Sequence, residues 1–246
     1  MSAEAPNERD AVPEHLAVIC DGNGRWARAH GLSRRRGHEE GVGSVRAVTE
    51  ECVRVGGIRQ VTYYGLSYDN RLKRPKSEIS ALYQILRRYL RRELPVLMEN
   101  NIRFRVIGEI DDFPKSLRDE IARAVTTSAP NSGMVMCLAL NYSGRREIAH
   151  AAGEIARRVR DGELDPGNVS VDDVARGLFT VGMPDVDLLV RAGGDMRVSD
   201  FLLWQISYAE IYVTDVYWPD FREPQLHEAL DWFATRQRRF GAVKGN

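Results

Sequence analysis

Six short runs of apolar and β-branched residues recur along this chain, and longer segments with helical periodicity separate them. Strands of this kind, buried on both faces and connected by helices, are typical of parallel sheets. The sequence therefore predicts one α/β domain with a central, mostly parallel six-stranded sheet flanked by helices. We expect its strands at residues 15–20, 60–66, 102–108, 134–142, 187–191 and 210–214.

The clearest helix is expected at residues 77–99, where Ile79, Leu82, Leu86 and Leu97 belong to an apolar stripe at helical spacing. Pro95 should kink or end that helix, because a proline lacks the backbone N–H and its ring clashes with the preceding turn. Further helices are expected at residues 45–55, 117–125, 148–159 and 226–240.

Length and composition limit the class of protein. The 246 residues suffice for one sizeable α/β domain, so we expect a flexible tail at residues 1–13 and a single domain at 14–246. A formal net charge of +0 argues against broad nucleic-acid binding. The three cysteines form no Cys-x-x-Cys pair, so neither zinc nor a disulfide framework is indicated. With no signal peptide and no long apolar span, we expect a cytoplasmic protein without a transmembrane segment, weak membrane-surface contact being left open.

Polar side chains follow four of the expected strands at the point where each strand ends. They occupy residues 21–25, 67–74, 141–145 and 191–199. Ligands of open parallel sheets bind beyond the carboxyl ends of the strands. The four clusters are therefore expected to converge on one rim of the sheet.

The first cluster carries the strongest chemical signal. The turn 21–26, with the sequence Asp-Gly-Asn-Gly-Arg-Trp, follows a strand and opens a helical stretch, and a helix N-terminus is an anion site. The carboxylate of Asp21 would repel a phosphate unless a divalent cation lay between them. Mg²⁺ is usually bound by one or two carboxylates together with phosphate oxygens. The turn therefore predicts a magnesium–diphosphate site.

The same cluster continues with Arg34, Arg35, Arg36 and His38. Arginine binds phosphate through two N–H groups and keeps its charge. A plain glycine turn followed by a solvated basic loop would explain either part alone. The combination of Asp, Asn, Arg and His near one helix entrance favours the functional interpretation.

The other clusters are weaker on their own. Arg191, Arg197 and Ser199 straddle a glycine loop that would suit a second diphosphate, although a surface loop with paired charges has a similar composition. The residues around Ser67 would position a substrate, although turn residues before a helix look much the same. Glu210, at the start of a strand, would complete a metal site or cap a helix end, and the sequence favours neither.

Taken together, these segments resemble the cis-prenyltransferase family, which comprises undecaprenyl diphosphate synthase and other Z-isoprenyl diphosphate synthases. The similarity runs from about His15 to the C-terminus. It rests on runs 21–27, Gly37-His38, Arg74-Pro75, 140–142, Arg191 with Arg197 and Ser199, 201–205, 208–210, 218–221 and 239–241.

The resemblance implies a role for each matching residue. Asp21 would hold Mg²⁺ on an allylic diphosphate, with Glu210 as a second metal ligand, and Asn23 and Asn70 would act with Asp21 in catalysis. The family's C-terminal Arg-x-Gly motif reaches the active site across a dimer, which implies a homodimer here. The implied substrate-binding residues are Gly22, Gly24, Arg25, Trp26, Arg34, His38, Ser67, Arg74, Arg191, Arg197, Ser199, Arg239 and Gly241.

The activity implied is that of a prenyl diphosphate synthase. It would condense an allylic isoprenoid diphosphate with a second C5 isoprenoid diphosphate and release pyrophosphate. The hydrocarbon chain requires an apolar tunnel, which we expect along residues 83–97 and 134–140. Tyr83, Met134 and Met136 are bulky enough to block such a tunnel, so a short product is expected.

Several residues depart from the family's pattern near the reacting ends of the substrates. The usual Ser-Thr-Glu-Asn-Trp is 67–71 here, with Arg71 at the tryptophan position and one extra residue before Arg74. The usual glutamate and asparagine of the second glycine loop are Asp195 and Asp200, and Cys137 replaces a frequent asparagine.

These departures keep a second reaction open, the irregular head-to-middle coupling of two allylic diphosphates to a branched, lavandulyl-type product. A third interpretation, a non-catalytic partner subunit of a cis-prenyltransferase, is disfavoured because such subunits lose the Asp-Gly-Asn-Gly-Arg run that this chain keeps.

Overall fold

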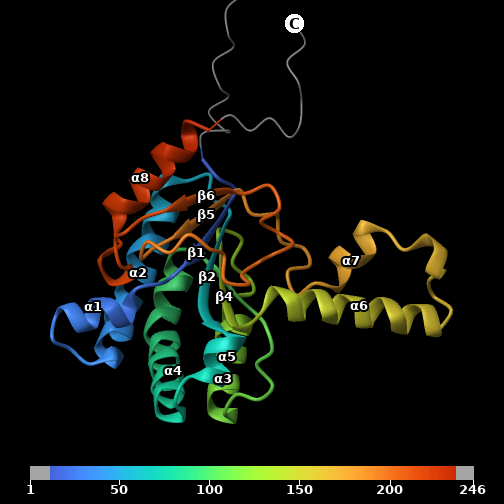
Figure 1. The fold of residues 1–246 in the computed structure, drawn as a ribbon, viewed down its shortest axis with the longest axis horizontal. Helices are drawn as coiled ribbons and strands as arrows, with labels where there is room; N and C mark the ends of the chain where they lie inside the picture. The colour runs from blue at the N-terminus through green and yellow to red at the C-terminus, as the bar shows by residue number, and fades with distance from the viewer. Residues whose placement is uncertain (1–11, 237–246) are drawn as a thin grey trace, which may run out of the picture.

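A six-stranded sheet forms the centre of the computed structural model, which describes residues 12–236 (Figure 1). All five strand pairings are parallel, in the order β3-β4-β2-β1-β5-β6. The six expected strands are all present. Their bounds are β1 His15–Ile19, β2 Gln60–Ser67, β3 Arg103–Ile107, β4 Val135–Tyr142, β5 Leu188–Arg191 and β6 Glu210–Val213.

The register of the central strands aligns their carboxyl ends. Leu16 of β1 lies beside Val61 of β2 and Leu188 of β5, and Ile19 lies beside Arg191. The turn that follows β1 and the glycine loop that follows β5 therefore leave the sheet side by side, as the clustering of polar residues predicted.

The helices extend most of the expected segments. Two short helices, α3 and α7, were not expected. The bounds are α1 Asn23–Ala29, α2 Arg34–Val55, α3 Tyr68–Lys73, α4 Lys76–Glu99, α5 Lys115–Ser128, α6 Gly144–Arg160, α7 Val171–Gly177 and α8 Glu223–Ala234, with 3₁₀ turns η2 Pro166–Asn168 and η3 Trp218–Asp220.

Pro95 does not end α4, which continues to Glu99. Leu94 and Leu97 on either side of the proline are buried in the main core. Pro95 has no backbone N–H, so α4 lacks one of its backbone hydrogen bonds at this point. Packing of the apolar face against the core stabilises the helix despite this loss.

Two apolar cores cover the two faces of the sheet. Helices α2, α4, α5 and α8 pack on one face, around residues such as Val48, Leu90 and Leu226. On the other face Leu189 and Ala139 are covered by the segments that carry Phe179, Phe201 and neighbouring residues. Helices α6 and α7 extend away from the sheet as an arm (Figure 1).

Two sequence predictions fall partly outside the described residues. Most of the expected tail, 1–13, is not described, although Pro13 is, and its side chain is buried. The last expected helix, 226–240, is described only as far as residue 236 and ends as α8 at Ala234. None of the helices within 12–236 combines the length and apolar character needed to span a membrane.

Candidate functional site

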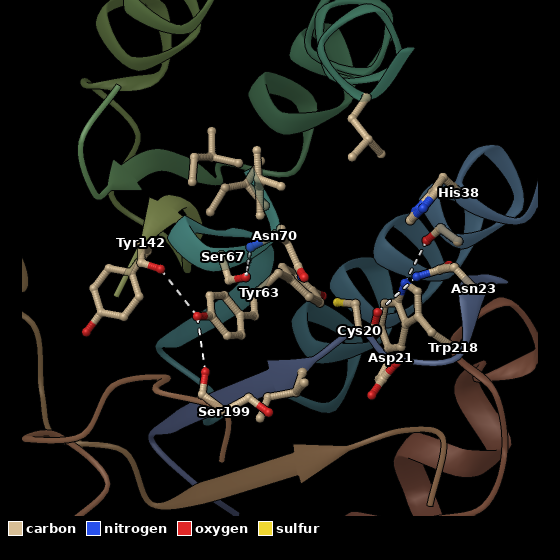
Figure 2. A pocket seen from close by; sticks show the side chains of 18 of the residues that line it. Cys20, Asp21, Asn23, His38, Tyr63, Ser67, Asn70, Tyr142, Ser199 and Trp218 are labelled. Atoms are coloured by element: carbon tan, nitrogen blue, oxygen red, sulfur yellow. Dashed lines mark hydrogen bonds between the residues drawn. The ribbon is translucent and has the colours of Figure 1, made fainter. Parts of the chain in front are cut away.

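One cavity of about 1140 Å³ opens at the carboxyl edge of the sheet and gathers the predicted polar clusters. Figure 2 shows Asp21, Asn23 and His38 on one side of it and Tyr142 and Ser199 on the other. Of the residues predicted to act on substrate, those that line it are Asp21, Gly22, Asn23, Gly24, Arg25, Arg34, His38, Ser67, Asn70, Arg74, Arg191, Arg197 and Ser199.

The turn after β1 presents the Asp21 carboxylate at the centre of the polar rim. Gly22 has a positive φ of 94°, and a Cβ there would lie 2.6 Å from the Tyr217 ring, so this position requires glycine. The backbone N–H of Gly22 donates to Asp21 Oδ1 at 2.6 Å. The turn thus fixes one oxygen of the carboxylate by a local backbone contact.

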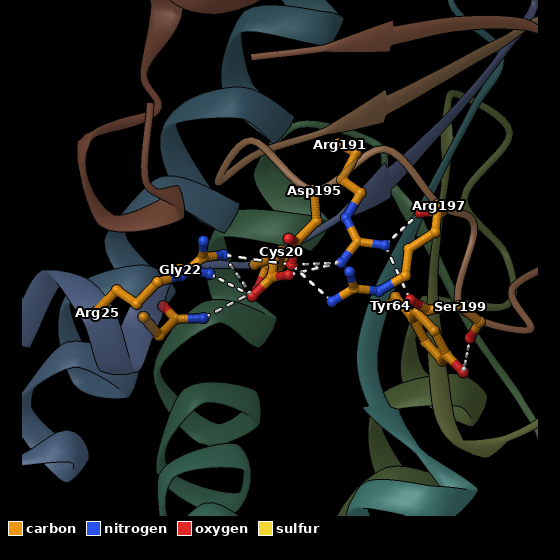
Figure 3. Close-up of polar contacts among 10 residues, drawn as sticks. Cys20, Gly22, Arg25, Tyr64, Arg191, Asp195, Arg197 and Ser199 are labelled. Carbon is orange, nitrogen blue, oxygen red and sulfur yellow. Dashed lines mark hydrogen bonds and ion pairs between the residues drawn. The ribbon is translucent and has the colours of Figure 1, made fainter. Parts of the chain in front are cut away.

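Two arginines make the other contacts of this carboxylate: Arg25, four residues further along the chain, and Arg191 at the end of β5, both labelled in Figure 3. Arg191 Nη2 donates to Asp21 Oδ2 at 2.7 Å, and Arg25 Nη2 lies 3.3 Å from Oδ1. Burial by itself would raise the pKa of Asp21, but the hydrogen bonds from Arg191 and Gly22 and the two guanidinium charges bring it below its usual value. Asp21 is therefore ionised at neutral pH.

Arg191 organises the glycine loop that follows β5. Its side chain is only 4% exposed, and it donates through Nη1 to Ser199 Oγ at 2.8 Å and to the carbonyl of Arg197. One oxygen of Asp195 accepts from Arg197 at 2.7 Å and from Arg191 at 3.3 Å. The same oxygen lies 3.7 Å from Arg25, so the two predicted diphosphate sites share one charged network.

A second basic cluster lies at the start of α2. Cations at a helix N-terminus oppose the helix dipole, yet Arg34 lies in the first turn, where its Nε is 3.2 Å from Glu78 Oε1. Arg74 Nη1 approaches the same oxygen at 3.1 Å. Burial, together with the charges of Arg74 and Arg34, lowers the pKa of His38 to about 4, so its imidazole is neutral at pH 7.

Three buried polar atoms of cavity-lining residues have no hydrogen-bond partner among the described residues. They are Asn23 Oδ1, His38 Nε2 and Arg191 Nε. Buried polar atoms are satisfied in the great majority of protein structures. Asn23 Nδ2 donates to the carbonyl of Cys20 at 2.9 Å, and its oxygen lies against Gly41 of α2.

Helix α3 borders the cavity, and Arg74 at its end adjoins the second basic cluster. The Ser67 hydroxyl accepts from the Asn70 backbone N–H at 3.1 Å and so begins this six-residue helix. Asn70 and Arg74 reach the cavity from the same short segment. The helix was missed in the sequence because six residues are too few to show helical periodicity.

The interior of the cavity is apolar. Helix α4 contributes a face of Leu82, Tyr83, Ile85, Leu86 and Tyr89. Strand β4 adds Leu138 and Leu140, and Phe113 comes from the loop before α5. Met134 and Met136, which we expected to block a tunnel, do not line the cavity. Both are buried in the core, where Tyr89 Oη donates to the Met136 sulfur at 3.6 Å.

Some predicted site residues lie elsewhere. Trp26 does not line the cavity, because its indole N–H donates to Asp220 at 2.7 Å and its ring stacks on His30. Glu210 begins β6 opposite Leu188, at the amino end of the strand, whereas Asp21 lies beyond the carboxyl end of β1. The two carboxylates therefore do not meet within one chain. Arg239 and Gly241 lie outside the described residues.

Several residues of the site were not predicted. Tyr64 stacks on Phe201 with ring centroids 4.4 Å apart, and its hydroxyl donates to the carbonyls of Tyr142 and Ser199 at 3.3 Å each. Asp195 joins three arginines, as described above. Tyr64 resembles an ordinary strand residue in the sequence, so no sequence signal marked it. For Asp195 the signal was its position between Arg191 and Arg197.

The donors present fit a hard divalent cation only in part. Within residues 12–236 there is no group of three or more His, Cys, Asp or Glu side chains placed to hold a metal. Asp21 offers one ionised carboxylate with 32% of its side chain exposed. A single carboxylate suits Mg²⁺ when substrate phosphates supply further oxygens. The site therefore fits a metal that arrives with a diphosphate.

Comparison with known sequences finds one family over most of the chain. Residues 19–241 match the family model described as "Putative undecaprenyl diphosphate synthase". An isoprenyl transferase of Clostridium tetani is 43% identical over 234 residues, which cover 95% of this chain and 91% of the relative. The (2E,6E)-farnesyl-diphosphate-specific ditrans,polycis-undecaprenyl-diphosphate synthase of Vibrio cholerae is 43% identical over 96% of this chain and 93% of its own length.

Solved structures show the same fold. Lavandulyl diphosphate synthase from Lavandula x intermedia, in complex with dimethylallyl diphosphate, superimposes with a TM-score of 0.91 at 35% identity, covering 94% of this chain and 99% of the other. A probable undecaprenyl diphosphate synthase from Campylobacter jejuni gives a TM-score of 0.76 at 30% identity over the same shares.

Proposed function

Because the chain belongs to the undecaprenyl diphosphate synthase family and is a prenyltransferase of the prenyl diphosphate synthase type, we propose that it joins an allylic isoprenoid diphosphate to a second C5 isoprenoid diphosphate, releases pyrophosphate and forms a short product. One observation carries this proposal. Two arginine clusters linked through Asp21 share a single cavity with an apolar interior.

In this proposal the allylic diphosphate binds at the turn after β1. Arg25, Arg34 and the helix N-terminus at Asn23 present N–H donors, and His38 lines the same part of the cavity. Mg²⁺ held by Asp21 would supply charge neutralisation for the departing pyrophosphate. The arginines stabilise the same charge because they are already oriented before the bond breaks.

The second diphosphate is assigned to the loop after β5. Arg191 is buried and held in place, Arg197 is 63% exposed, and Ser199 accepts a hydrogen bond from Arg191. This set offers one fixed and one mobile guanidinium to an incoming diphosphate. The carbon–carbon bond forms when the acceptor's double bond attacks the allylic carbon. A proton then leaves the new product, and the released pyrophosphate is the base we assign to it.

A short product is supported by the aromatic lining of the apolar interior. Tyr63, Tyr83 and Tyr89 all border the cavity, and Tyr89 is fixed from behind by its contact with Met136. Bulky rings anchored by hydrogen bonds resist displacement by a growing chain.

The test is a direct assay of the purified full-length chain. Dimethylallyl, geranyl and farnesyl diphosphates are each supplied with isopentenyl diphosphate and Mg²⁺, pyrophosphate release is followed, and products are identified by mass spectrometry and NMR. Short head-to-tail products support the proposal. Products of many C5 units would overturn the short-chain part, and absence of turnover with every donor would count against catalysis by this chain alone.

Irregular coupling of two allylic diphosphates is a second candidate. It is favoured by the TM-score of 0.91 with lavandulyl diphosphate synthase and by the substitutions at Arg71, Asp195 and Asp200. The same assay separates the two reactions. A branched product formed from dimethylallyl diphosphate without isopentenyl diphosphate excludes an obligatory head-to-tail reaction.

We also propose that the active form is a cytoplasmic homodimer in which the segment carrying Arg239 and Gly241 serves the partner's site. Co-expression of an Asp21→Ala chain with an Arg239→Ala chain tests this. Recovery of activity in the mixed dimer supports the proposal, and failure to recover any contradicts it. A chain that is inert alone but active with a different subunit would instead favour the non-catalytic interpretation.

A further inference from the structure

We propose that Arg71 is a positioning residue that sets the length of the prenyl chain the cavity accepts, by fixing the aromatic wall formed by Tyr83 and Phe113. This inference rests on the proposed function, because it concerns the hydrocarbon part of the same substrate. Arg71 is not among the residues that line the cavity, but it contacts Tyr83, which is.

The wall consists of two rings from different elements. Tyr83 belongs to α4, and Phe113 lies in the loop just before α5. Their ring centroids are 4.7 Å apart with planes inclined by 46°, and both rings line the cavity. Phe113 is 3% exposed, so it has little room to move. A hydrocarbon chain that extends along this side therefore meets a packed aromatic pair.

Arg71 ties this wall to the rim of the polar site. Its Nε donates to the Tyr83 hydroxyl at 3.2 Å, and its Nη2 donates to Asp112 at 3.2 Å. The Arg71 side chain is 18% exposed, whereas that of Asp112 is 74% exposed. One guanidinium thus connects α3, α4 and the loop before α5, next to Asn70, which lines the cavity.

The two contacts of Arg71 are unequal. An ion pair with a carboxylate as exposed as Asp112 contributes little, because water screens it. The hydrogen bond to Tyr83 is less exposed to water than the ion pair with Asp112. It therefore restricts the movement of the Tyr83 ring. A chain that pushes the Tyr83 ring aside would break this hydrogen bond and leave the largely buried guanidinium with only the exposed Asp112 of these two partners.

The experiment compares product lengths among point variants of the full chain. Arg71→Met removes the anchor and keeps the length of the side chain, Tyr83→Phe keeps the ring and removes the hydroxyl, and Tyr83→Leu removes the ring. Lys73→Met is the matched control, since Lys73 lies on the same helix, is 74% exposed and pairs with Asp69.

We expect Arg71→Met and Tyr83→Phe each to raise the share of products one C5 unit longer by about tenfold, and Tyr83→Leu to raise it further. Lys73→Met should give the wild-type distribution. Affinities for geranyl and farnesyl thiolodiphosphates, measured by calorimetry, should shift in the same order towards the longer analogue. If Arg71→Met is poorly folded, Tyr83→Phe decides the question, because it deletes only one hydroxyl.

Two results would overturn the inference. They are a wild-type distribution in both Arg71→Met and Tyr83→Phe, and an equal shift in Lys73→Met. Failure of the proposed function looks different, because the wild-type chain would then release no pyrophosphate with any allylic donor. A chain that turns over normally with unchanged product length in the variants rejects only the role of Arg71.

Discussion

Asp21 and Arg191 meet at 2.7 Å, although 170 residues separate them in the sequence. Each residue follows or ends a strand, and β1 and β5 are neighbours in the sheet with Ile19 beside Arg191. The ion pair therefore results directly from strand order. It joins Asp21, the predicted metal ligand, to Arg191, a residue predicted to bind the second diphosphate.

Replacing Asp21 by alanine should lower kcat by on the order of 10³-fold or more, because the charge that counters the departing pyrophosphate loses its anchor. The fold should survive, since Arg191 keeps Asp195 as a carboxylate partner at 3.3 Å. The measurements are steady-state kinetics and a thermal melt. Asp69→Ala, which removes another acid from the cavity lining, is the control. A near-normal rate in Asp21→Ala would remove this residue from the mechanism.

Arg197→Ala should raise the KM of the acceptor diphosphate by about tenfold with little change in kcat, as expected when binding shared by ground and transition states is lost. The side chain is 63% exposed and contacts Asp195, so the effect on stability should be small. Arg59→Ala removes a similarly exposed charge, paired with Glu14, and serves as the control. An unchanged acceptor KM would contradict the assignment.

Gly41→Ala should damage the site through packing. A Cβ at this position would lie 2.2 Å from Asn23 Oδ1 and 2.9 Å from the Trp218 ring, so Asn23 must move. Overpacking of this kind costs about 1–3 kcal/mol, and a shift of a catalytic group by about 1 Å can lower the rate by about 100-fold.

Gly43→Ala on the same helix is the control for this prediction, because its Cβ would lie 3.5 Å from the nearest atom, Arg222 Nη2. It should leave the rate unchanged and stabilise the helix by up to about 1 kcal/mol. Urea unfolding and kcat of both variants check the prediction, and equal behaviour of the two would refute it.

Stability should fall in mild acid because of His15. Burial lowers its pKa to about 4, against the opposing effects of the Pro184 carbonyl and Asp187. The unfolded chain, with a pKa near 6.5, therefore binds more protons between pH 6.5 and 4. The stabilisation is complete above pH 6.5 and is lost as the pH falls towards 4, by about 2 kcal/mol at pH 5.

Urea unfolding of the wild type and of His15→Gln between pH 5 and 7 measures this contribution. The variant should show a smaller loss, and the remainder should include His38, whose pKa is lowered in the same direction. His150→Gln, with a side chain that is 45% exposed, should behave as the wild type. An identical pH dependence in His15→Gln would show that this residue does not carry the effect.

Removal of divalent metal with EDTA should stop turnover and leave the melting temperature unchanged. Among residues 12–236 no preformed cluster of three or more metal-ligating side chains exists, so the metal is expected to bind together with diphosphate. Melts with and without Mg²⁺, each with and without a thiolodiphosphate analogue, check this. A melting temperature that rises with Mg²⁺ alone would indicate a preformed site instead.

The sequence predicted all six strands and most residues of the polar rim, because β-branched runs, glycine turns and charged residues at strand ends are local signals. It did not reveal α3, since its six residues are ordered by the Ser67 cap and by contacts with α4. It also did not reveal Tyr64, whose position depends on stacking against Phe201 from a segment more than a hundred residues away.

The amino-acid sequence by itself determined the parallel α/β architecture, the glycine turn at Asp21 and the family to which the chain belongs, because each of these depends on neighbours in the chain. Only the tertiary structure decided which charges meet. Strand order brings Asp21 to Arg191, whereas the end of β6 at which Glu210 lies keeps it away from Asp21 within one chain. The physical reason is that Coulomb and hydrogen-bond energies depend on separation in space, which the spacing of residues along the sequence does not specify.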